Sequence, residues 1–178
     1  MATSARTDAV AASDGAVAAA TAHFLTFSLG AELYALDIRC VREIIQVCAM
    51  TPVPLMPGFV RGVINLRGAV VPVIDPHARF GRPRAVLGKK SCIVIFEGEP
   101  VDGERCELGL LVDAVSAVVE IPGTAIEPAP AFGTPVQRDY IRGIGKLGPR
   151  FVVILEPGKA FDLNEMAGLC ATSQLELA

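Results

Sequence analysis

The feature that most constrains this chain is an internal repeat. Residues 59–80, FVRGVINLRGAVVPVIDPHARF, align without a gap with residues 140–161, YIRGIGKLGPRFVVILEPGKAF, at a constant offset of 81. Upstream the offset becomes 74, because residues 41–47 align with residues 115–121, and a seven-residue insertion at 133–139 accounts for the change. The identical pairs are Arg61/Arg142, Gly62/Gly143, Leu66/Leu147, Val71/Val152, Pro76/Pro157 and Phe80/Phe161. Such self-similarity predicts two related structural units.

Each half has the pattern of five short strands joined by tight turns. Composition agrees, since only 6% of residues are aromatic while 52% are hydrophobic, with abundant Gly and Pro. The expected strands are 24–29, 32–38, 41–47, 60–66 and 69–74 in the first half, and 92–96, 106–112, 115–121, 140–147 and 151–155 in the second. We also expect a helical turn at 76–80 and a closing helix at about 159–169.

Five short antiparallel strands with tight turns favour a small barrel. A unit of this size is marginal alone, because it buries only about 60% of its unfolded surface. We therefore expect two barrels packed together, barrel 1 at about 23–81 and barrel 2 at about 90–158, joined by a polar, turn-prone stretch. The predicted fold class is all-β in the main, with short helical segments.

The termini and the charge exclude several classes of function. Residues 1–22 form an Ala-rich lead, broken by Asp and Gly, that we expect to be disordered, and 170–178 form a tail. No segment has the length of a membrane span or the pattern of a signal peptide, so direct membrane insertion is not expected. The net charge is −3 and the pI about 5.4, which argues against nucleic-acid binding.

Cysteine and histidine usage argues against a metal site, a cofactor or catalysis. The five cysteines form no C-x-x-C pair and suggest reduced side chains in a cytoplasmic protein. The only histidines, His23 and His77, build no catalytic constellation, so no catalytic residue is proposed. Residues 88–91, GKKS, resemble a phosphate-binding loop but have Pro83 where that motif requires glycine.

Several strings resemble the CheW-like coupling domains of bacterial chemotaxis. They are YALDIRCVREI and FVRGVINLRGAVVPVID in the first half, and LGLLVDAVSAVVEI, AIEPAPAF and DYIRGIGKLGPRFVVIL in the second. The resemblance implies a CheW-like domain at 23–168 made of two SH3-like five-stranded barrels with a groove between them. It also implies an adaptor that couples the cytoplasmic hairpin of methyl-accepting chemoreceptors to a CheA-type histidine kinase. Such an adaptor would be cytoplasmic, associated with membrane receptor arrays through its partners, and would join rings with kinase regulatory domains.

The resemblance also implies two sets of binding residues. The receptor-binding set is Ile38, Val41, Glu43, Gly62, Arg67, Val115 and Val118. The kinase-binding set is Pro54, Pro57, Phe59, Pro128 and Phe132. From strand periodicity alone, the three valines of the first set would be core residues, and only the resemblance favours their placement in a groove.

The repeat serves as a control on these assignments. Arg67 is matched by Gly148, and Glu43 by Ala117, so neither feature is doubled. Features present in one half only are better candidates for a one-sided function. We therefore hypothesise that Arg67 and Glu43 lie close together on adjacent strands and orient a partner.

Two other functions remain open at this stage. An SH3-like barrel that binds RNA or proline-rich peptides is disfavoured by the acidic pI. A CheW-like adaptor of a pilus-motility or other non-flagellar chemosensory system has the same pattern, because only the identity of the bound kinase and receptor distinguishes it.

Overall fold

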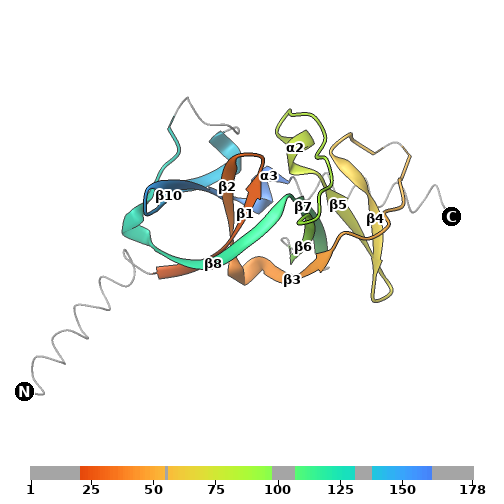
Figure 1. Cartoon of the computed structure of the whole chain (residues 1–178), viewed down its shortest axis with the longest axis horizontal. Helices are drawn as coiled ribbons and strands as arrows, with labels where there is room; N and C mark the ends of the chain where they lie inside the picture. Colours follow the sequence, from red (N-terminus) through yellow and green to blue (C-terminus); the bar gives the residue numbers. More distant parts are fainter. Residues whose placement is uncertain (1–20, 55, 98–106, 131–137, 162–178) are drawn as a thin grey trace, which may run out of the picture.

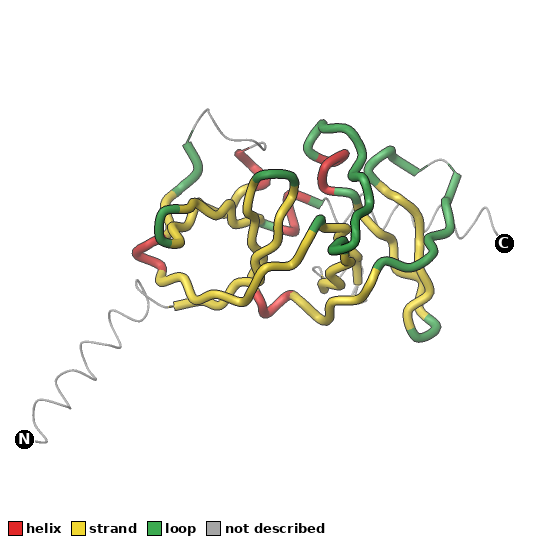
Figure 2. Tube along the Cα trace, in the orientation of Figure 1, coloured by secondary structure: helices red, strands yellow, loops and turns green. Residues whose placement is uncertain are grey.

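The structure, a computed structural model, describes residues 21–54, 56–97, 107–130 and 138–161 (Figure 1). Strands dominate, with short helical turns between them (Figure 2), so the expected mainly-β class is confirmed. The strands are β1 (Thr21–Leu29), β2 (Glu32–Asp37), β3 (Val41–Gln46), β4 (Val60–Leu66), β5 (Ala69–Ile74), β6 (Cys92–Glu97), β7 (Glu107–Val112), β8 (Ala114–Pro122), β9 (Ile126–Glu127), β10 (Ile141–Leu147) and β11 (Arg150–Leu155). The helical segments are η1 (Ile38–Cys40), α2 (Pro76–Arg79), η2 (Gly123–Ala125), η3 (Arg138–Tyr140) and α3 (Pro157–Ala160).

The element bounds agree closely with those expected from the sequence. Strands β4 and β5 have the expected ends, and the ends of the other expected strands differ by at most three residues within the described ranges. The two-residue strand β9 was not expected. The closing helix was expected from about 159, whereas α3 begins at Pro157 and Phe161 caps its end. Residues 1–20 of the expected lead, 162–169 of the closing helix and the tail lie outside the described residues.

The strands pair across the two halves of the sequence. The first sheet has the order β8-β1-β2-β11-β10-β9, and the second has the order β3-β6-β7-β5-β4. The hairpin β1–β2 therefore belongs with the strands of the second half, and its repeat counterpart β6–β7 belongs with those of the first half. This pairing corrects the expected division into barrel 1 at about 23–81 and barrel 2 at about 90–158.

Each exchanged hairpin is held by an antiparallel pairing on one side, β1 with β8 and β6 with β3, and by a parallel pairing on the other. Tyr34 of β2 pairs with Val153 of β11, and Gly109 of β7 pairs with Val73 of β5. All other strand pairs are antiparallel among the described residues. Local periodicity determines where a strand runs but does not determine its neighbour, so this exchange was not accessible from the sequence pattern.

Each sheet curls, so that the chain following the strand at one end of the order, β3 or β8, reaches β4 or β10 at the other end. The chain after β3 forms a bridge from Thr51 to Val63 of β4, and the chain after β8 forms β9, which pairs with β10. Gly62 lies at the first of these contacts, and a Cβ atom there would lie 2.6 Å from the carbonyl oxygen of Thr51. At the second contact, a Cβ on Gly143 would lie 2.5 Å from Cγ2 of Ile126. The doubled glycine therefore permits closure of both barrels.

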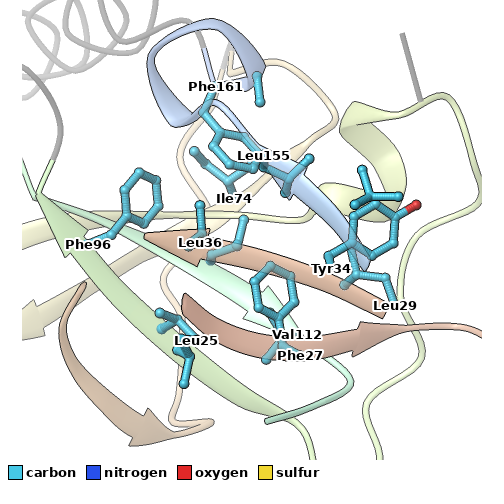
Figure 3. Close-up of a cluster of buried hydrophobic side chains, with 14 of the residues drawn as sticks. Leu25, Phe27, Leu29, Tyr34, Leu36, Ile74, Phe96, Val112, Leu155 and Phe161 are labelled. Carbon is cyan, nitrogen blue, oxygen red and sulfur yellow. The ribbon is translucent and has the colours of Figure 1, made fainter. Parts of the chain in front are cut away.

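The strands where the two barrels meet are buried on both faces. In β6, Ile93 and Ile95 belong to the cluster inside the second sheet, whereas Val94 and Phe96 belong to the central cluster. A strand buried on both faces has a continuous apolar sequence, as CIVIF does here. Figure 3 shows the central cluster, where side chains from both sheets meet.

Aromatic rings continue this core from one barrel to the other. Tyr34 stacks on Phe27 and on Phe80 with ring centroids 6.3 and 6.0 Å apart, respectively. Phe161 then contacts both Phe80 and Phe96, at 6.3 and 5.7 Å. Burial of one such side chain contributes about 1.5–3 kcal/mol to folding.

Arg79 of α2 lies between two rings that occupy equivalent places in the repeat. Its guanidinium carbon is 4.7 Å from the centroid of Phe59 and 5.1 Å from that of Tyr140. Its Nε also donates a hydrogen bond to the carbonyl oxygen of Ala160 in α3, at 2.8 Å. Cation–π contacts to two rings together with this hydrogen bond join the two barrels.

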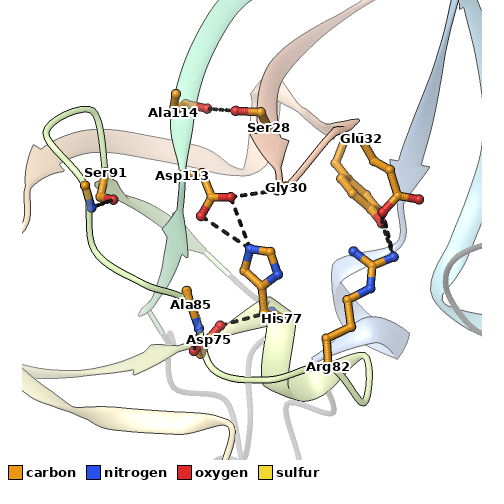
Figure 4. Close-up of polar contacts among 12 residues, drawn as sticks. Ser28, Gly30, Glu32, Asp75, His77, Arg82, Ala85, Ser91, Asp113 and Ala114 are labelled. Carbon is orange, nitrogen blue, oxygen red and sulfur yellow. Dashed lines mark hydrogen bonds and ion pairs between the residues drawn. The ribbon is translucent and has the colours of Figure 1, made fainter.

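Asp75 is the buried polar centre of the linker region (Figure 4). Its side chain is fully buried and accepts hydrogen bonds from the backbone N–H groups of His77 and Ala85, at 3.0 and 2.8 Å. It also forms an ion pair with Arg61 at 3.1 Å. The repeat counterpart Glu156 caps α3 without any side-chain hydrogen bond to it. Only the first half thus has a buried carboxylate at this position.

Replacing Asp75 with Ala is expected to lower the free energy of unfolding by about 3–5 kcal/mol, because Arg61 would keep a largely buried, uncompensated charge. Urea denaturation of both proteins measures this loss. The matched control is Glu156→Ala, which should cost under about 1 kcal/mol because no helix-capping hydrogen bond is lost. Equal losses in the two variants would contradict this role for Asp75.

Candidate functional site

The sequence-predicted receptor-binding residues lie on three parts of the structure. Ile38, Val41 and Glu43 follow one another through η1 and β3. Gly62 and Arg67 lie on β4 and the turn after it, and Val115 and Val118 lie on β8. Strands β3 and β8 each stand at the end of a sheet in the strand order, and both run along the lower side of the view in Figure 1.

The Arg67 and Glu43 side chains are in contact, with Arg67 Nη2 donating to Glu43 Oε2 at 2.5 Å. Arg67 is 75% exposed and Glu43 26% exposed. The hydrogen bond to Glu43 raises the pKa of Arg67. Among the described residues, the second carboxylate oxygen of Glu43, Oε1, is shielded from solvent and accepts no hydrogen bond.

The route by which these two side chains meet differs from the hypothesis of adjacent strands. Strands β3 and β4 stand at opposite ends of the second sheet, and its closure brings them together. Arg67 lies in the hairpin turn after β4, where its φ of 53° is in the left-handed region. Gly68 follows with a φ of 86°, and its N–H donates to Asn65 Oδ1 at 2.9 Å. Positive φ at both central residues is the geometry of a type I′ hairpin turn.

The apolar members of the receptor-binding set are not equally exposed. Ile38, Val41 and Val115 are half-buried and pack against the central cluster. Val118 is 53% exposed, so it is not the core residue that strand periodicity alone predicts. Gly62 is buried, and it lies against Thr51 at the contact that closes the barrel.

The residues predicted from the sequence to bind a kinase lie in two separate regions. Pro54 is exposed and Pro57 half-buried in the loop between β3 and β4, while Phe59 packs beneath the Arg79 guanidinium. Pro128 is exposed and lines a hollow of about 610 Å³. Phe132 lies outside the described residues.

The hollow beside Pro128 has an apolar wall that sequence analysis did not identify. Phe151 of β11 is 62% exposed and lines it, together with Leu33 of β2. Val70, the repeat counterpart of Phe151, is likewise 64% exposed on β5. The alignment of the two halves pairs these two apolar residues, and the structure exposes both of them, so the repeat could have drawn attention to this position.

A charged cluster that was not expected from the sequence lies at the junction of β2 and η1. Asp37 accepts hydrogen bonds from the Arg39 side chain, the shortest at 2.8 Å, and from Arg142 Nη1 at 3.2 Å. The side-chain hydrogen bond from Arg39, with a backbone hydrogen bond from the same residue and one from Arg142, lowers the pKa of Asp37 to about 2. The cluster lines a second hollow, of about 390 Å³, which Ile38 also lines.

No helix in the described part of the chain is long and apolar enough to cross a membrane.

Comparisons with known proteins agree on one family. The CheW-like domain model matches residues 23–165. The chain is 34% identical over 144 residues to the chemotaxis protein CheW of Klebsiella aerogenes, covering 81% of this chain and 84% of that protein. It is 32% identical over 146 residues to the chemotaxis protein CheW of Treponema pallidum, covering 82% and 85%. Among solved structures, the scaffolding protein TtCheW of Thermoanaerobacter tengcongensis matches with a TM-score of 0.68 and 38% identity, covering 76% of this chain and 84% of that one.

Replacement of Asp37 with Asn is expected to destabilise the protein in a pH-dependent way. The folded-state pKa of about 2 lies below the ordinary value of 3.8, so the carboxylate stabilises the fold above pH 3.8. This contribution is lost as the pH falls through the folded-state value of about 2. Urea-unfolding midpoints of wild type and variant should therefore differ at neutral pH and converge toward pH 2. A difference that persists unchanged at the acid end would contradict the ionic role.

Proposed function

The chain belongs to the CheW-like family of chemotaxis scaffold proteins, and on that premise we propose that it couples a chemoreceptor to a CheA-type histidine kinase. In this proposal the protein is a cytoplasmic adaptor without catalytic activity, held at membrane receptor arrays by its partners. The observation that carries the proposal is the Arg67–Glu43 pair, which is charged, surface-exposed on its Arg67 side and present in one half only.

The backbone of Arg67 supports a role for its side chain beyond folding. A non-glycine residue in the left-handed region costs about 1–2 kcal/mol. The equivalent turn of the second half has Gly148 at a φ of 58°, so glycine meets the same backbone requirement without this strain. An exposed ion pair contributes only about 0–1 kcal/mol and does not offset the strain by a clear margin. Retention of arginine here is consistent with contact to a partner.

Glu43 adds orientation and a second polar contact. Its Oε2 holds the Arg67 guanidinium, and Oε1 is left as an acceptor without a donor among the described residues. A shielded carboxylate oxygen without a partner is unfavourable, so a donor from a bound receptor would stabilise it. The pair can thus offer a partner both a donor and an acceptor.

The apolar residues beside this pair suit a helical partner. Val118 is exposed, and Ile38, Val41 and Val115 are half-buried and present apolar atoms at the surface. Chemoreceptor tips are helical hairpins, and an amphipathic helix binds an apolar surface through residues spaced along one face. Single contacts of this size are weak, but a receptor array increases the effective concentration of each partner.

We propose that the kinase binds at the barrel surfaces that bear Pro128 and Pro54. The hollow beside Pro128 has Phe151 and Leu33 on its wall, which would receive an apolar side chain. Pro54, Pro57 and Phe59 belong to the opposite barrel. Because Phe59 packs against Arg79, we expect it to hold the loop in position for the kinase. Phe132, which lies outside the described residues, is included in the proposed kinase contact only because of the family resemblance. Two such surfaces on one molecule would allow rings with kinase regulatory domains.

The receptor contact is tested by co-sedimentation with membranes that carry a chemoreceptor from the same organism, with and without its histidine kinase. Wild type is expected to sediment and to carry kinase with it. Arg67→Glu should reduce the sedimented fraction about tenfold or more, because it places like charge against Glu43 and against the acceptor groups of the partner. Arg67→Gly, which reproduces the backbone of the second half, should fold at least as well as wild type and still lose receptor binding.

Sedimentation of Arg67→Gly at the wild-type level would overturn the role of this side chain. Failure of wild type to bind any receptor or kinase would overturn the adaptor proposal itself.

The kinase contact is tested by Phe151→Asp, which places a charge on the wall of the hollow beside Pro128. We expect loss of kinase from the sediment while the adaptor itself still binds receptor membranes, because the two surfaces are separate. The matched control is Val86→Asp, an equally drastic change at a linker residue that is 89% exposed and outside the hollow. Equal kinase recruitment by the two variants would contradict this assignment.

A further inference from the structure

The repeat places the same residue, arginine, at positions 61 and 142, and the structure uses the two differently. Arg61 is 17% exposed and held by buried Asp75 and by the carbonyl oxygen of Ala85, at 3.1 and 3.0 Å. Arg142 is 43% exposed, and it donates a hydrogen bond to Asp37, whereas Arg61 is bound by Asp75, the counterpart of Glu156. The structural role of the first arginine is therefore not repeated by the second.

Arg142 and Arg39 share a single carboxylate. Arg39 engages both oxygens of Asp37, with Nε at 3.1 and 3.2 Å and Nη2 at 2.8 Å, and its backbone N–H also donates to Oδ1. The bond from Arg142 is longer, at 3.2 Å, and its guanidinium carbon lies 5.9 Å from the ring centroid of Phe24. Two guanidinium groups around one carboxylate leave an excess of one positive charge at this place.

The other titratable side chain that lines the hollow, His23, does not neutralise the positive charge of the two arginines. His23 lines the hollow, and its Nε2 lies 2.9 Å from Glu120 of β8, so these two residues form a pair of their own. Arg39 is 79% exposed, and with Arg142 it has N–H groups available to a further acceptor. The hollow of about 390 Å³ is large enough for a side chain to enter.

The position of the hollow connects it to the receptor-facing residues. Ile38 lies on its wall between Asp37 and Arg39, and η1 leads from it directly into Val41 and Glu43 of β3. A helix lying along Ile38 and Val41 would carry side chains past the opening of the hollow. An acidic side chain at that point would find two arginine donors, and bidentate arginine–carboxylate contacts are among the strongest polar interactions at interfaces.

We infer that the hollow between Arg39 and Arg142 receives an aspartate or glutamate side chain of the helical receptor partner. This inference rests on the proposed function and adds a second charged contact to it, at the far end of η1 from Arg67. The two contacts make different demands on the partner, since the Arg67–Glu43 pair offers both a donor and an acceptor, whereas the hollow offers donors to an acceptor alone. Together they would set the direction in which the helix lies.

The experiment measures binding of the full chain to a soluble cytoplasmic hairpin fragment of the chemoreceptor, by calorimetry at low and moderate salt. Arg142→Gln is expected to weaken binding about 5- to 20-fold at low salt and to reduce the salt dependence of the affinity. The matched control is Lys146→Gln, which removes the same charge from an exposed residue of the same strand outside the hollow and should change affinity less than about twofold. Arg39→Gln tests the same site independently if Arg142→Gln does not fold.

A charge exchange then identifies the partner residue. Asp and Glu residues on the hairpin are changed singly to Arg, and one of them is expected to restore binding to Arg142→Glu while weakening binding to wild type. This inference would be overturned if Arg142→Gln and Arg39→Gln both bound with wild-type affinity. If Arg67→Glu failed to bind in the same experiment, the proposed function would still stand. No binding by wild type itself would overturn both.

Discussion

The exchange of the hairpins β1–β2 and β6–β7 between the two halves is the constraint on which the rest of the structure depends. Each exchanged hairpin lies between strands of the other half, with a parallel contact on one side, β2 with β11 and β7 with β5, and an antiparallel contact on the other, β1 with β8 and β6 with β3. Strands of both hairpins are consequently buried on both faces. One face of each strand packs inside a barrel, and the opposite face packs in the central cluster. The two barrels therefore share a core and cannot be separated without exposing it. A shared core of this kind is compatible with the proposed coupling of a receptor to a kinase.

The repeat shows how one backbone supports different chemistry in its two copies. Closure of each barrel requires glycine at the same place, so Gly62 and Gly143 are both retained. Asp75 caps its helix and binds Arg61, whereas Glu156 makes no such cap, consistent with the weaker preference of the longer side chain for an N-cap position. Arg142, the counterpart of Arg61, donates a hydrogen bond to Asp37. A residue conserved between the halves can thus have two roles, which qualifies the use of doubling as a sign of purely structural function.

Much of the local structure was predictable from particular residues. The tight turns at Gly30 and Gly68, and Asp75 followed by Pro76, mark strand and helix ends through backbone preferences that act over a few residues. The proximity of Arg67 and Glu43 was also expected, but for a reason that proved wrong. They meet because the sheet closes on itself, and Arg67 stands in the turn and not on the strand. The exposure of Phe151 and the hollow around Arg142 were not expected, because both depend on neighbours from distant strands.

The strands, their turns, the repeat and the family could all be predicted without the structure, because each depends on residues close together along the chain or on their linear order. The sequence also determined that Arg67 and Glu43 have no counterparts in the second half. Which strands pair, which of two aligned arginines is the less exposed, and which charges gather around Ile38 depend on the three-dimensional arrangement of the whole chain. An apolar pattern indicates that one face of a strand must be buried, but many other strands could bury it. The choice among them depends on burying both faces of every central strand at once, a condition that belongs to the whole chain and to no single segment.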